Sequence, residues 1–349
     1  MVSTTGRRES VRKEKRSLIC AVWELTLACN LRCSHCGSSA GQARPNELDT
    51  KECYRLCEEL ASLNCRDVSL MGGEPFLRPD CFSIARCVKQ LGMNLSFVSN
   101  GTVLEQCLDE IERVEPKVVG VSLDGMKDSH ERIRGSGTWE KAVGAVEALR
   151  SRDIQTTVIT TVSKINFKDL PKLKDLLLKK GVNWQIQTAM PFGNFQKEFV
   201  LSKEEYYATA LFIAKERIRN KFEDLPVVGA HCYGYHSRVL PGCRWNGCQA
   251  GMSSIGITSD GNVVGCLSMG NDRFIEGNVR KRSLVEVWND PGTYAYNRKK
   301  EMKKAGPNCE NCKHEPECGG GCNSVSYSLT GMFHNNPYCF LAIENANGY

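Results

Sequence analysis

The run Leu18-Ile-Cys-Ala-Val-Trp-Glu-Leu-Thr-Leu27-Ala-Cys29-Asn-Leu-Arg-Cys33-Ser-His-Cys36 decides the fold of this chain. Its first ten residues are mostly apolar and predict a buried strand. The strand leads into three cysteines, and three thiolates on one loop can converge on one metal centre. A structural zinc site takes four protein ligands, whereas a four-iron cluster held by three cysteines keeps one iron open to another ligand.

Further strand candidates follow at regular intervals, with amphipathic helical patterns between them. They are Asp67–Met71, Asn94–Ser99, Lys117–Leu123, Gln155–Val162 and Trp184–Ala189. Six strand–helix repeats predict parallel strands that are buried on both faces. An open doubly wound sheet and a barrel are both compatible with this pattern. Polar motifs at the strand ends favour an α/β fold of the partial (β/α)6 TIM-type barrel class, with its chemistry at the carboxyl ends of the strands.

The amino-acid composition changes after a helical pattern around Glu204–Arg219. From Pro226 onward Gly, Asn, Pro and Cys dominate. We therefore expect little helical periodicity there. A domain of this kind needs cross-links or bound metal to stay folded. The predicted division is a basic flexible tail (1–17), a partial barrel (18–222) and a small, cysteine-rich and loop-rich domain (223–349).

Charge and composition exclude several classes of function. The net charge is +6, but six basic and two acidic residues of the first 18 supply most of it, so we expect no nucleic-acid partner. No apolar run is long enough to span a membrane and no secretory signal precedes the first strand, which predicts a cytoplasmic protein without membrane contact. In such a chain, 19 cysteines indicate metal or cluster ligands rather than disulfides.

The C-x3-C-x2-C spacing of Cys29, Cys33 and Cys36 resembles that of the radical S-adenosylmethionine (SAM) superfamily. The resemblance implies that these cysteines hold a [4Fe–4S] cluster whose open iron chelates SAM. In that family an electron from the cluster cleaves SAM to methionine and a 5′-deoxyadenosyl radical, which abstracts a substrate hydrogen. His35 is expected to pack over the cluster rather than to bind it.

The resemblance also implies a set of SAM contacts. A Gly-Gly-Glu motif ends the second strand and would hold the amino group, and the ends of the third and fourth strands would contact the ribose and the carboxylate. An arginine would pair with the carboxylate. The residues are Gly72, Gly73, Glu74, Asn100, Ser122, Asp124 and Arg134. Taken singly, each motif is also a good turn sequence.

The remaining cysteine pattern resembles the SPASM domain, which carries two auxiliary [4Fe–4S] clusters. The resemblance assigns the outer cluster to Cys309, Cys312, Cys318 and Cys339. It assigns the inner cluster to Cys248, Cys266 and Cys322, with Cys243 as our choice for the fourth ligand. The chain would then bind three clusters. Two zinc sites could be built from the same eight cysteines.

Eight other cysteines are expected to pack as small apolar side chains. They are Cys20, Cys53, Cys57, Cys65, Cys81, Cys87, Cys107 and Cys232. No general acid or base can be identified from the sequence.

Auxiliary clusters suggest net oxidation of the substrate, because they can accept the electron of a product radical. Many SPASM proteins modify ribosomally made peptides, so we expect a peptide or protein substrate that receives a cross-link or a side-chain oxidation. The short stretch before Cys29 implies a separate leader-binding protein or direct binding, and a flavodoxin or ferredoxin would donate electrons. The alternatives are a small-molecule dehydrogenase or decarboxylase of a cofactor pathway, for example one acting on a porphyrin precursor, and a non-catalytic iron–sulfur scaffold. The intact Gly-Gly-Glu motif argues against the scaffold.

Overall fold

The computed structural model describes residues 16–219, 224–230, 233, 236–240, 245–269, 272–299 and 304–348. Its centre is a sheet of ten strands in the order β10-β9-β8-β1-β2-β3-β4-β5-β6-β7. From β8 to β7 every neighbouring pair is parallel, and only β9 and β10 run antiparallel to their neighbours. The strands are β1 (Cys20–Thr26), β2 (Asp67–Gly72), β3 (Asn94–Ser99), β4 (Val118–Ser122), β5 (Thr156–Val162), β6 (Asn183–Thr188), β7 (Val227–Gly229), β8 (Ser254–Ile257), β9 (Asn262–Val264) and β10 (Ile275–Asn278).

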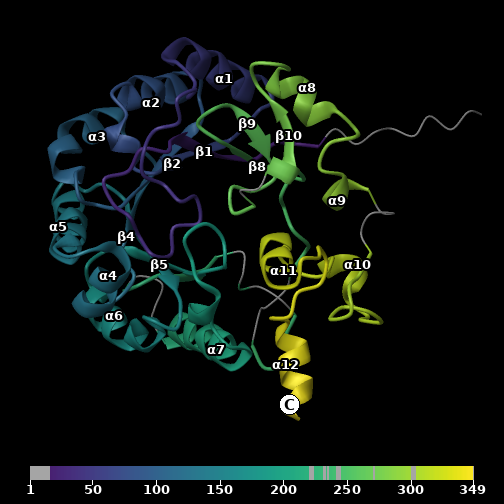
Figure 1. Ribbon diagram of the computed structural model, residues 1–349. Coiled ribbons are helices and arrows are strands. Elements are labelled where there is room, and N and C mark those ends of the chain that lie inside the picture. Colours follow the sequence, from purple (N-terminus) through teal and green to yellow (C-terminus); the bar gives the residue numbers. More distant parts are fainter. Residues whose placement is uncertain are drawn as a thin grey trace, which may run out of the picture.

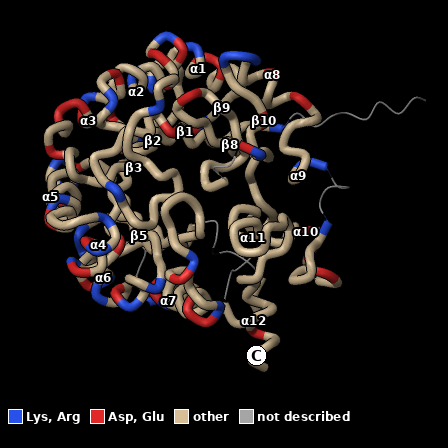
Figure 2. Tube along the Cα trace, in the orientation of Figure 1, with Lys and Arg blue, Asp and Glu red and all other residues tan. Residues whose placement is uncertain are grey.

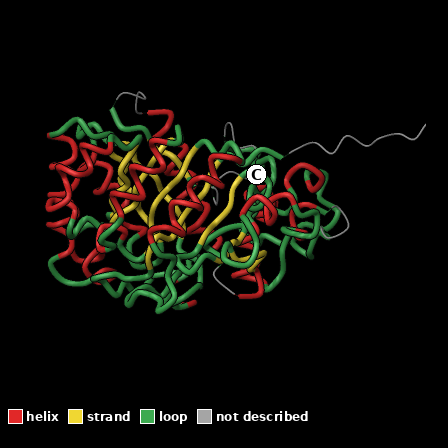
Figure 3. The backbone as a smooth tube through the Cα atoms, turned by 90° about the horizontal axis from the view of Figure 1, so that it is seen from above, coloured by secondary structure: helices red, strands yellow, loops and turns green. Residues whose placement is uncertain are grey.

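Helices cover the outside of the strand arc, as Figure 1 shows for the barrel half of the molecule. The helices of this half are α1 (Thr50–Ser62), α2 (Cys81–Gln90), α3 (Leu108–Val114), α4 (Lys127–Arg134), α5 (Thr138–Ser151), α6 (Leu170–Leu177) and α7 (Lys203–Arg219). In the view turned by 90°, the strands lie side by side between helices, and loops gather beyond their ends (Figure 3). The charged residues concentrate on the outer helices (Figure 2).

The predicted partial barrel is confirmed, and each of the six predicted strands agrees with the structure to within two residues at either end. The helix predicted behind Asp49 or Thr50 begins at Thr50. Its cap is a reciprocal pair in which Asp49 accepts from the Glu52 amide and Glu52 accepts from the Asp49 amide. Local sequence signals therefore locate the barrel elements well.

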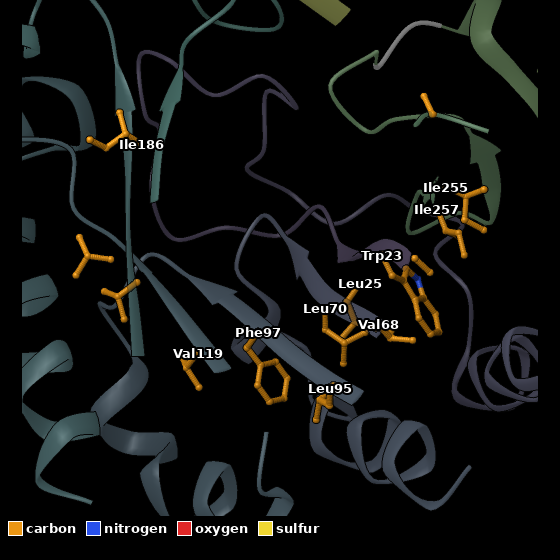
Figure 4. Packing of buried hydrophobic residues seen from close by; sticks show 14 of the residues in the cluster. Trp23, Leu25, Val68, Leu70, Leu95, Phe97, Val119, Ile186, Ile255 and Ile257 are labelled. Atoms are coloured by element: carbon orange, nitrogen blue, oxygen red, sulfur yellow. The ribbon is translucent and has the colours of Figure 1, made fainter. Parts of the chain in front are cut away.

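The core lies between the sheet and the outer helices (Figure 4). Alternate residues of the central strands supply it, among them Trp23 and Leu25 on β1 and Leu95 and Phe97 on β3, all of which are fully buried. Each such side chain contributes about 1.5–3 kcal/mol by leaving water. Four of the cysteines expected to pack as apolar groups are also buried there, namely Cys53, Cys57, Cys65 and Cys81. Cys232 lies outside the described residues.

The C-terminal part contains more regular structure than the sequence suggested. Besides β8 to β10 it has α8 (Leu284–Asn289), α9 (Ala295–Arg298), α10 (Glu315–Cys318), α11 (Asn323–Thr330) and α12 (Phe340–Ala346). These helices, of four to eight residues, are too short to show a helical period in the sequence. One signal was present: Ser283 and Glu286 form a capping box at the start of α8.

The sheet does not end at the predicted domain boundary between residues 222 and 223. β7 pairs with β6, and β8 pairs with β1 on the opposite side of the arc. The division of the chain into domains stays a prediction, and the hydrogen-bonded sheet crosses it. The predicted tail lies outside the described residues except for its last two. Within the described part of the chain, no helix combines the length and the apolar character that crossing a membrane requires.

Candidate functional site

The loop after β1 carries Cys29, Cys33 and Cys36 and is closed at its base by backbone hydrogen bonds. Gly41 donates to the Leu27 carbonyl and accepts from the Cys29 amide, each at 2.9 Å. Two amides of the loop point at sulfur: Leu31 N lies 3.4 Å from Cys29 Sγ, and Ala40 N lies 3.3 Å from Cys36 Sγ. Amide donors to sulfur stabilise thiolates, which are the form that binds metal.

The electrostatics of this loop suit a cationic cluster. Burial raises the pKa of Cys33 to about 11, and the charges of Cys29 and Cys36 also oppose its ionisation, while Arg134 favours it. Burial likewise raises the pKa of Cys29. Neighbouring buried thiolates need positive charge to become stable, and ferric or ferrous iron supplies it. The three cysteines therefore fit an iron–sulfur cluster by the chemistry of their donors.

Gly72 and Gly73 end β2 where the backbone of β1 comes close. Gly72 has a φ of +146°, and a Cβ added at Gly73 would overlap the Ala28 carbonyl. The amides of Gly73 and Glu74 donate to Thr26 O and Ala28 O at 2.8 Å. The glycines are thus required by the approach of two strand ends. The contact of both glycines with SAM, which the family resemblance implies, stays a prediction.

Glu74 is fully buried and links the end of β2 to the end of β3. Its carboxylate accepts a hydrogen bond from Ser99 Oγ at 3.0 Å and one from the Asn100 amide at 2.8 Å. Burial raises the pKa of Glu74 to about 7, although these donors act in the opposite direction. Both carboxylate oxygens therefore already have a donor from the protein. Ser99 was missed in the sequence, although it opens the Ser-Asn-Gly motif at this strand end.

Asn100 connects the same strand end to the cysteine loop. Its Nδ2 donates to Asn30 Oδ1 at 2.9 Å and lies 3.8 Å from Cys29 Sγ. Its Oδ1 accepts from the Thr102 amide at 2.9 Å. Ser122, the last residue of β4, is buried as well. The predicted contacts of the second, third and fourth strands all lie at strand ends on the side of the first cysteine loop.

Asp124 follows β4 and organises a buried charged cluster. Its carboxylate accepts from Arg134 Nε at 2.5 Å, from His35 Nε2 at 2.8 Å and from the Thr161 amide at 2.8 Å. Burial alone would raise the pKa of Asp124, but Arg134 and His35 hold it well below its usual range. His35 and Thr161 carry no sequence signal for this pairing, because one lies in the cysteine loop and the other on β5.

Arg134 brings this cluster to the cysteines. Its Nη1 lies 4.0 Å from Cys33 Sγ, and its side chain is only 10% exposed. The structure thus joins Cys33, Arg134, Asp124 and His35 into one connected group. His35 lies in the cysteine loop but points to Asp124, which refines the expectation that it packs over the cluster.

The four predicted outer ligands line one cavity. Cys309, Cys312, Cys318 and Cys339 line one partly open cavity, together with residues such as His314 and Asn336. Burial raises the pKa of Cys318 to about 12, and the other three sulfurs also oppose its ionisation. A shared cavity with four mutually close thiols fits a cluster of this kind.

Three of the predicted inner ligands also come together. The Asn323 amide, next to Cys322, donates to the sulfur of Cys248, and the charge of Cys266 opposes ionisation of Cys248. Burial is the main reason why the pKa values of Cys248 and Cys266 are raised. Cys243, the predicted fourth ligand, lies outside the described residues. Within the described ranges, no three His, Cys, Asp or Glu side chains converge on a single metal ion.

Comparison with known proteins gives two family models and several relatives. A model described as the Radical SAM superfamily matches residues 23–177, and the SPASM model, an iron-sulfur cluster-binding domain, matches residues 248–313. The mycofactocin maturase MftC of Mycobacterium ulcerans is 30% identical over 344 residues, which cover 91% of this chain and 86% of that protein. The AdoMet-dependent heme synthase of Methanosarcina barkeri is 28% identical over 340 residues, which cover 91% of this chain and 95% of that protein.

Solved structures share the fold. Streptococcus suis SuiB bound to S-adenosylmethionine has a TM-score of 0.73 at 15% identity, with 93% of this chain and 76% of that chain covered. Native anSMEcpe with bound AdoMet has a TM-score of 0.72 at 17% identity, with 94% and 95% covered.

Proposed function

Because the chain belongs to the radical SAM superfamily and carries a SPASM domain, we propose that it oxidatively modifies a ribosomally made peptide or protein. The chain is an enzyme that uses SAM and iron–sulfur clusters. The observation that carries the proposal is the meeting of the first cysteine loop with Glu74 and the Asp124–Arg134 pair at the carboxyl ends of the strands. In barrels of this class, chemistry is placed at that end.

In this proposal Cys29, Cys33 and Cys36 hold the first cluster. When bound, the cluster and SAM together supply an electron and a carbon radical that abstracts hydrogen from the substrate. The predicted SAM contacts are Gly72, Gly73, Glu74, Asn100, Ser122, Asp124 and Arg134.

The side chains of this set divide into two kinds by their contacts. Glu74 and Asn100 tie the ends of β2 and β3 to the cysteine loop, so they position backbone around the ligand. Asp124 holds Arg134 and His35, which leaves the guanidinium of Arg134 as the cation that suits the SAM carboxylate. Asp124 then acts on SAM indirectly, because it orients the guanidinium of Arg134.

The second and third clusters belong to the C-terminal cysteines in this proposal. The outer set is Cys309, Cys312, Cys318 and Cys339, and the inner set is Cys243, Cys248, Cys266 and Cys322. A cluster with four thiolate ligands has no open iron, so its role is electron transfer. It would receive the electron that a substrate radical gives up, while a flavodoxin or ferredoxin reduces the first cluster.

A peptide substrate is supported by the named relatives. MftC is a maturase, and SuiB has been solved bound to the precursor peptide SuiA. In this proposal a separate protein grips the leader peptide.

A second candidate is an enzyme that acts on a porphyrin precursor. The match to the AdoMet-dependent heme synthase favours it, since this chain covers 95% of that protein's length. The Fe-coproporphyrin III synthase of the same organism is 27% identical over 366 residues. In this case the substrate would be a small molecule buried in a closed, mainly apolar pocket.

One anaerobic experiment tests the function and separates the two candidates. The reconstituted, reduced chain is mixed with SAM, and methionine and 5′-deoxyadenosine are measured by mass spectrometry. A peptide encoded near the gene and Fe-coproporphyrin III are then added separately. We expect the peptide to lose hydrogen or carbon dioxide in the wild type and not in Cys33→Ala. Turnover of the porphyrin with an unchanged peptide would replace the first candidate by the second. About twelve irons per chain are expected for three clusters. If zinc is found in place of about eight of them, the chain does not bind the auxiliary clusters.

A further inference from the structure

Tyr296 on α9 has a buried hydroxyl group without a visible partner. The residue is 9% exposed, and among the described residues nothing accepts or donates a hydrogen bond at its Oη. A buried hydroxyl left unpaired costs about 1–3 kcal/mol, so native structures rarely keep one. The groups that surround the hydroxyl therefore decide which partner it has.

The hydroxyl lies among the inner cysteines. A Cβ added at Gly265 would overlap the Tyr296 Oη, and Gly265 directly precedes Cys266. The charges of Cys248 and Cys266 both act on this hydroxyl. A phenol O–H is a hydrogen-bond donor.

The neighbours of Tyr296 fix its ring in this place. Asn297 Nδ2 donates to Cys248 O at 2.7 Å and to Ala250 O at 2.8 Å, which ties α9 to the inner cysteine loop. His334 Nε2 lies 2.7 Å from the Tyr296 carbonyl, and the Tyr296 ring stacks on Phe333 at a centroid distance of 4.7 Å. The ring cannot swing out to water without breaking these contacts.

We propose that Tyr296 donates an O–H···S hydrogen bond to a sulfur of the inner auxiliary cluster and raises the reduction potential of that cluster. The inference rests on the proposed function, in which Cys248, Cys266 and Cys322 hold that cluster. Reduction adds one negative charge to the cluster, so a donor stabilises the reduced form more than the oxidised form. The electron from the substrate radical enters this cluster and leaves through the outer cluster to a one-electron carrier protein.

Tyr294 offers a matched control on the same segment. Its hydroxyl is also buried and unpaired among the described residues, and its pKa is raised by burial. Its charged neighbours are Arg298 and Glu276, and no cysteine within the described ranges acts on it. Removal of the Tyr294 hydroxyl therefore changes a buried phenol without changing the surroundings of the cluster.

The experiment is a redox titration of the reconstituted full chain, followed by electron paramagnetic resonance. Tyr296→Phe should lower the potential of one auxiliary cluster at unchanged iron content, and Tyr294→Phe should leave both potentials as in the wild type. Cys266→Ser identifies the signal of the inner cluster, because it alters a ligand of that cluster only. Equal potentials in Tyr296→Phe and the wild type, or a shift confined to the outer cluster, would overturn the inference.

Two further results separate failure of the inference from failure of the proposed function. If Cys266→Ser changes neither the iron content nor any cluster signal, no inner cluster is bound there and the proposed function itself is wrong. If Tyr296→Phe loses iron through misfolding, 3-fluorotyrosine at position 296 replaces it in the test. This phenol is a stronger donor, so it should raise the potential of the inner cluster, and an unchanged potential would again overturn the inference.

Discussion

The first cysteine loop and the outer cysteine set gather thiols on very different supports. The first loop is closed by backbone hydrogen bonds of Gly41 and lies at the ends of long parallel strands. The outer set lines a cavity between turns and helices as short as α10, with four residues. The barrel thus forms a frame that does not depend on the three cysteines of this loop. The outer cysteines add to the buried apolar residues of the surrounding segment, such as Val325, Phe340 and Ile343. We therefore expect the same residue type to serve chemistry in one region and folding in the other.

The largest difference between the two regions is expected when Cys29, Cys33 and Cys36 are all changed to Ala. It should abolish SAM cleavage and remove about four irons per chain, because these thiolates are the ligands of the first cluster. The thermal unfolding midpoint should stay near that of the wild-type apoprotein, because the loop base and the strands remain. Measurements of 5′-deoxyadenosine, iron and circular dichroism check this. Residual SAM cleavage would contradict the assignment.

The opposite pattern is expected for Cys318→Ala in the outer set. Loss of one of four ligands should lower iron content and also reduce solubility and the unfolding midpoint of the reconstituted protein, since cluster binding contributes to folding here. Calorimetry of soluble protein and iron analysis measure both effects. Cys87→Ala is the control, because Cys87 lies on α2 away from any predicted cluster. If Cys318→Ala and Cys87→Ala are equally stable, the outer cysteines do not contribute to folding and the proposed difference between the regions is wrong.

Asp124→Asn should be the most damaging change of a non-cysteine residue near the first loop. It keeps the acceptor for the Thr161 amide but leaves the buried guanidinium of Arg134 without its counter-charge. Removing one partner of a buried ion pair costs about 3–5 kcal/mol. Urea unfolding of the apoprotein measures this loss. Asp169→Asn, a half-buried carboxylate that accepts from the Met126 amide, is the control and should cost less.

Glu74 gives the smallest of these effects, a change in how stability depends on pH. The unfolded carboxyl titrates near 4.5, and the folded one has a pKa of about 7. Between these values the unfolded chain loses the proton first, so stability falls as the pH rises, by about 3 kcal/mol in total. Glu74→Gln should remove this fall in the apoprotein.

Urea titrations at pH 5 and pH 8 check the prediction for Glu74. Glu140→Gln serves as the control, because Glu140 lies on the surface of α5 and its pKa is lowered by a hydrogen bond from Lys127. If the free energy of unfolding still falls between pH 5 and pH 8 in Glu74→Gln, another group causes the fall.

The same contrast explains what the sequence revealed. The barrel strands were predicted closely because each is a run of apolar and β-branched residues between turn residues, as in Asn94–Ser99. Strands such as β9, with three residues, carry too little pattern to be recognised. Their place in the sheet comes from partners far along the chain, such as β8 beside β1.

Within the site, motifs located residues but not their partners. The Gly-Gly-Glu motif identified Glu74, whereas its bonds to Ser99 and Asn100 depend on how two strand ends meet. His35 beside Asp124 and Tyr296 beside the inner cysteines are likewise set by tertiary packing. Spacing rules apply to residues on one loop, and these pairs lie on different loops.

The pairing of β1 with β8 has a consequence for synthesis of the chain. β1 carries the first cysteine loop, and its Cys20 lies opposite Ser254, near the other end of the sequence. Contacts between such distant segments form late, and the ribosome releases the N-terminal part first. Until β8 has emerged, one edge of β1 stays without its strand partner and is open to wrong pairing. Assembly of the first cluster before that moment would act on a nascent chain, and delivery of iron after release would meet the completed sheet.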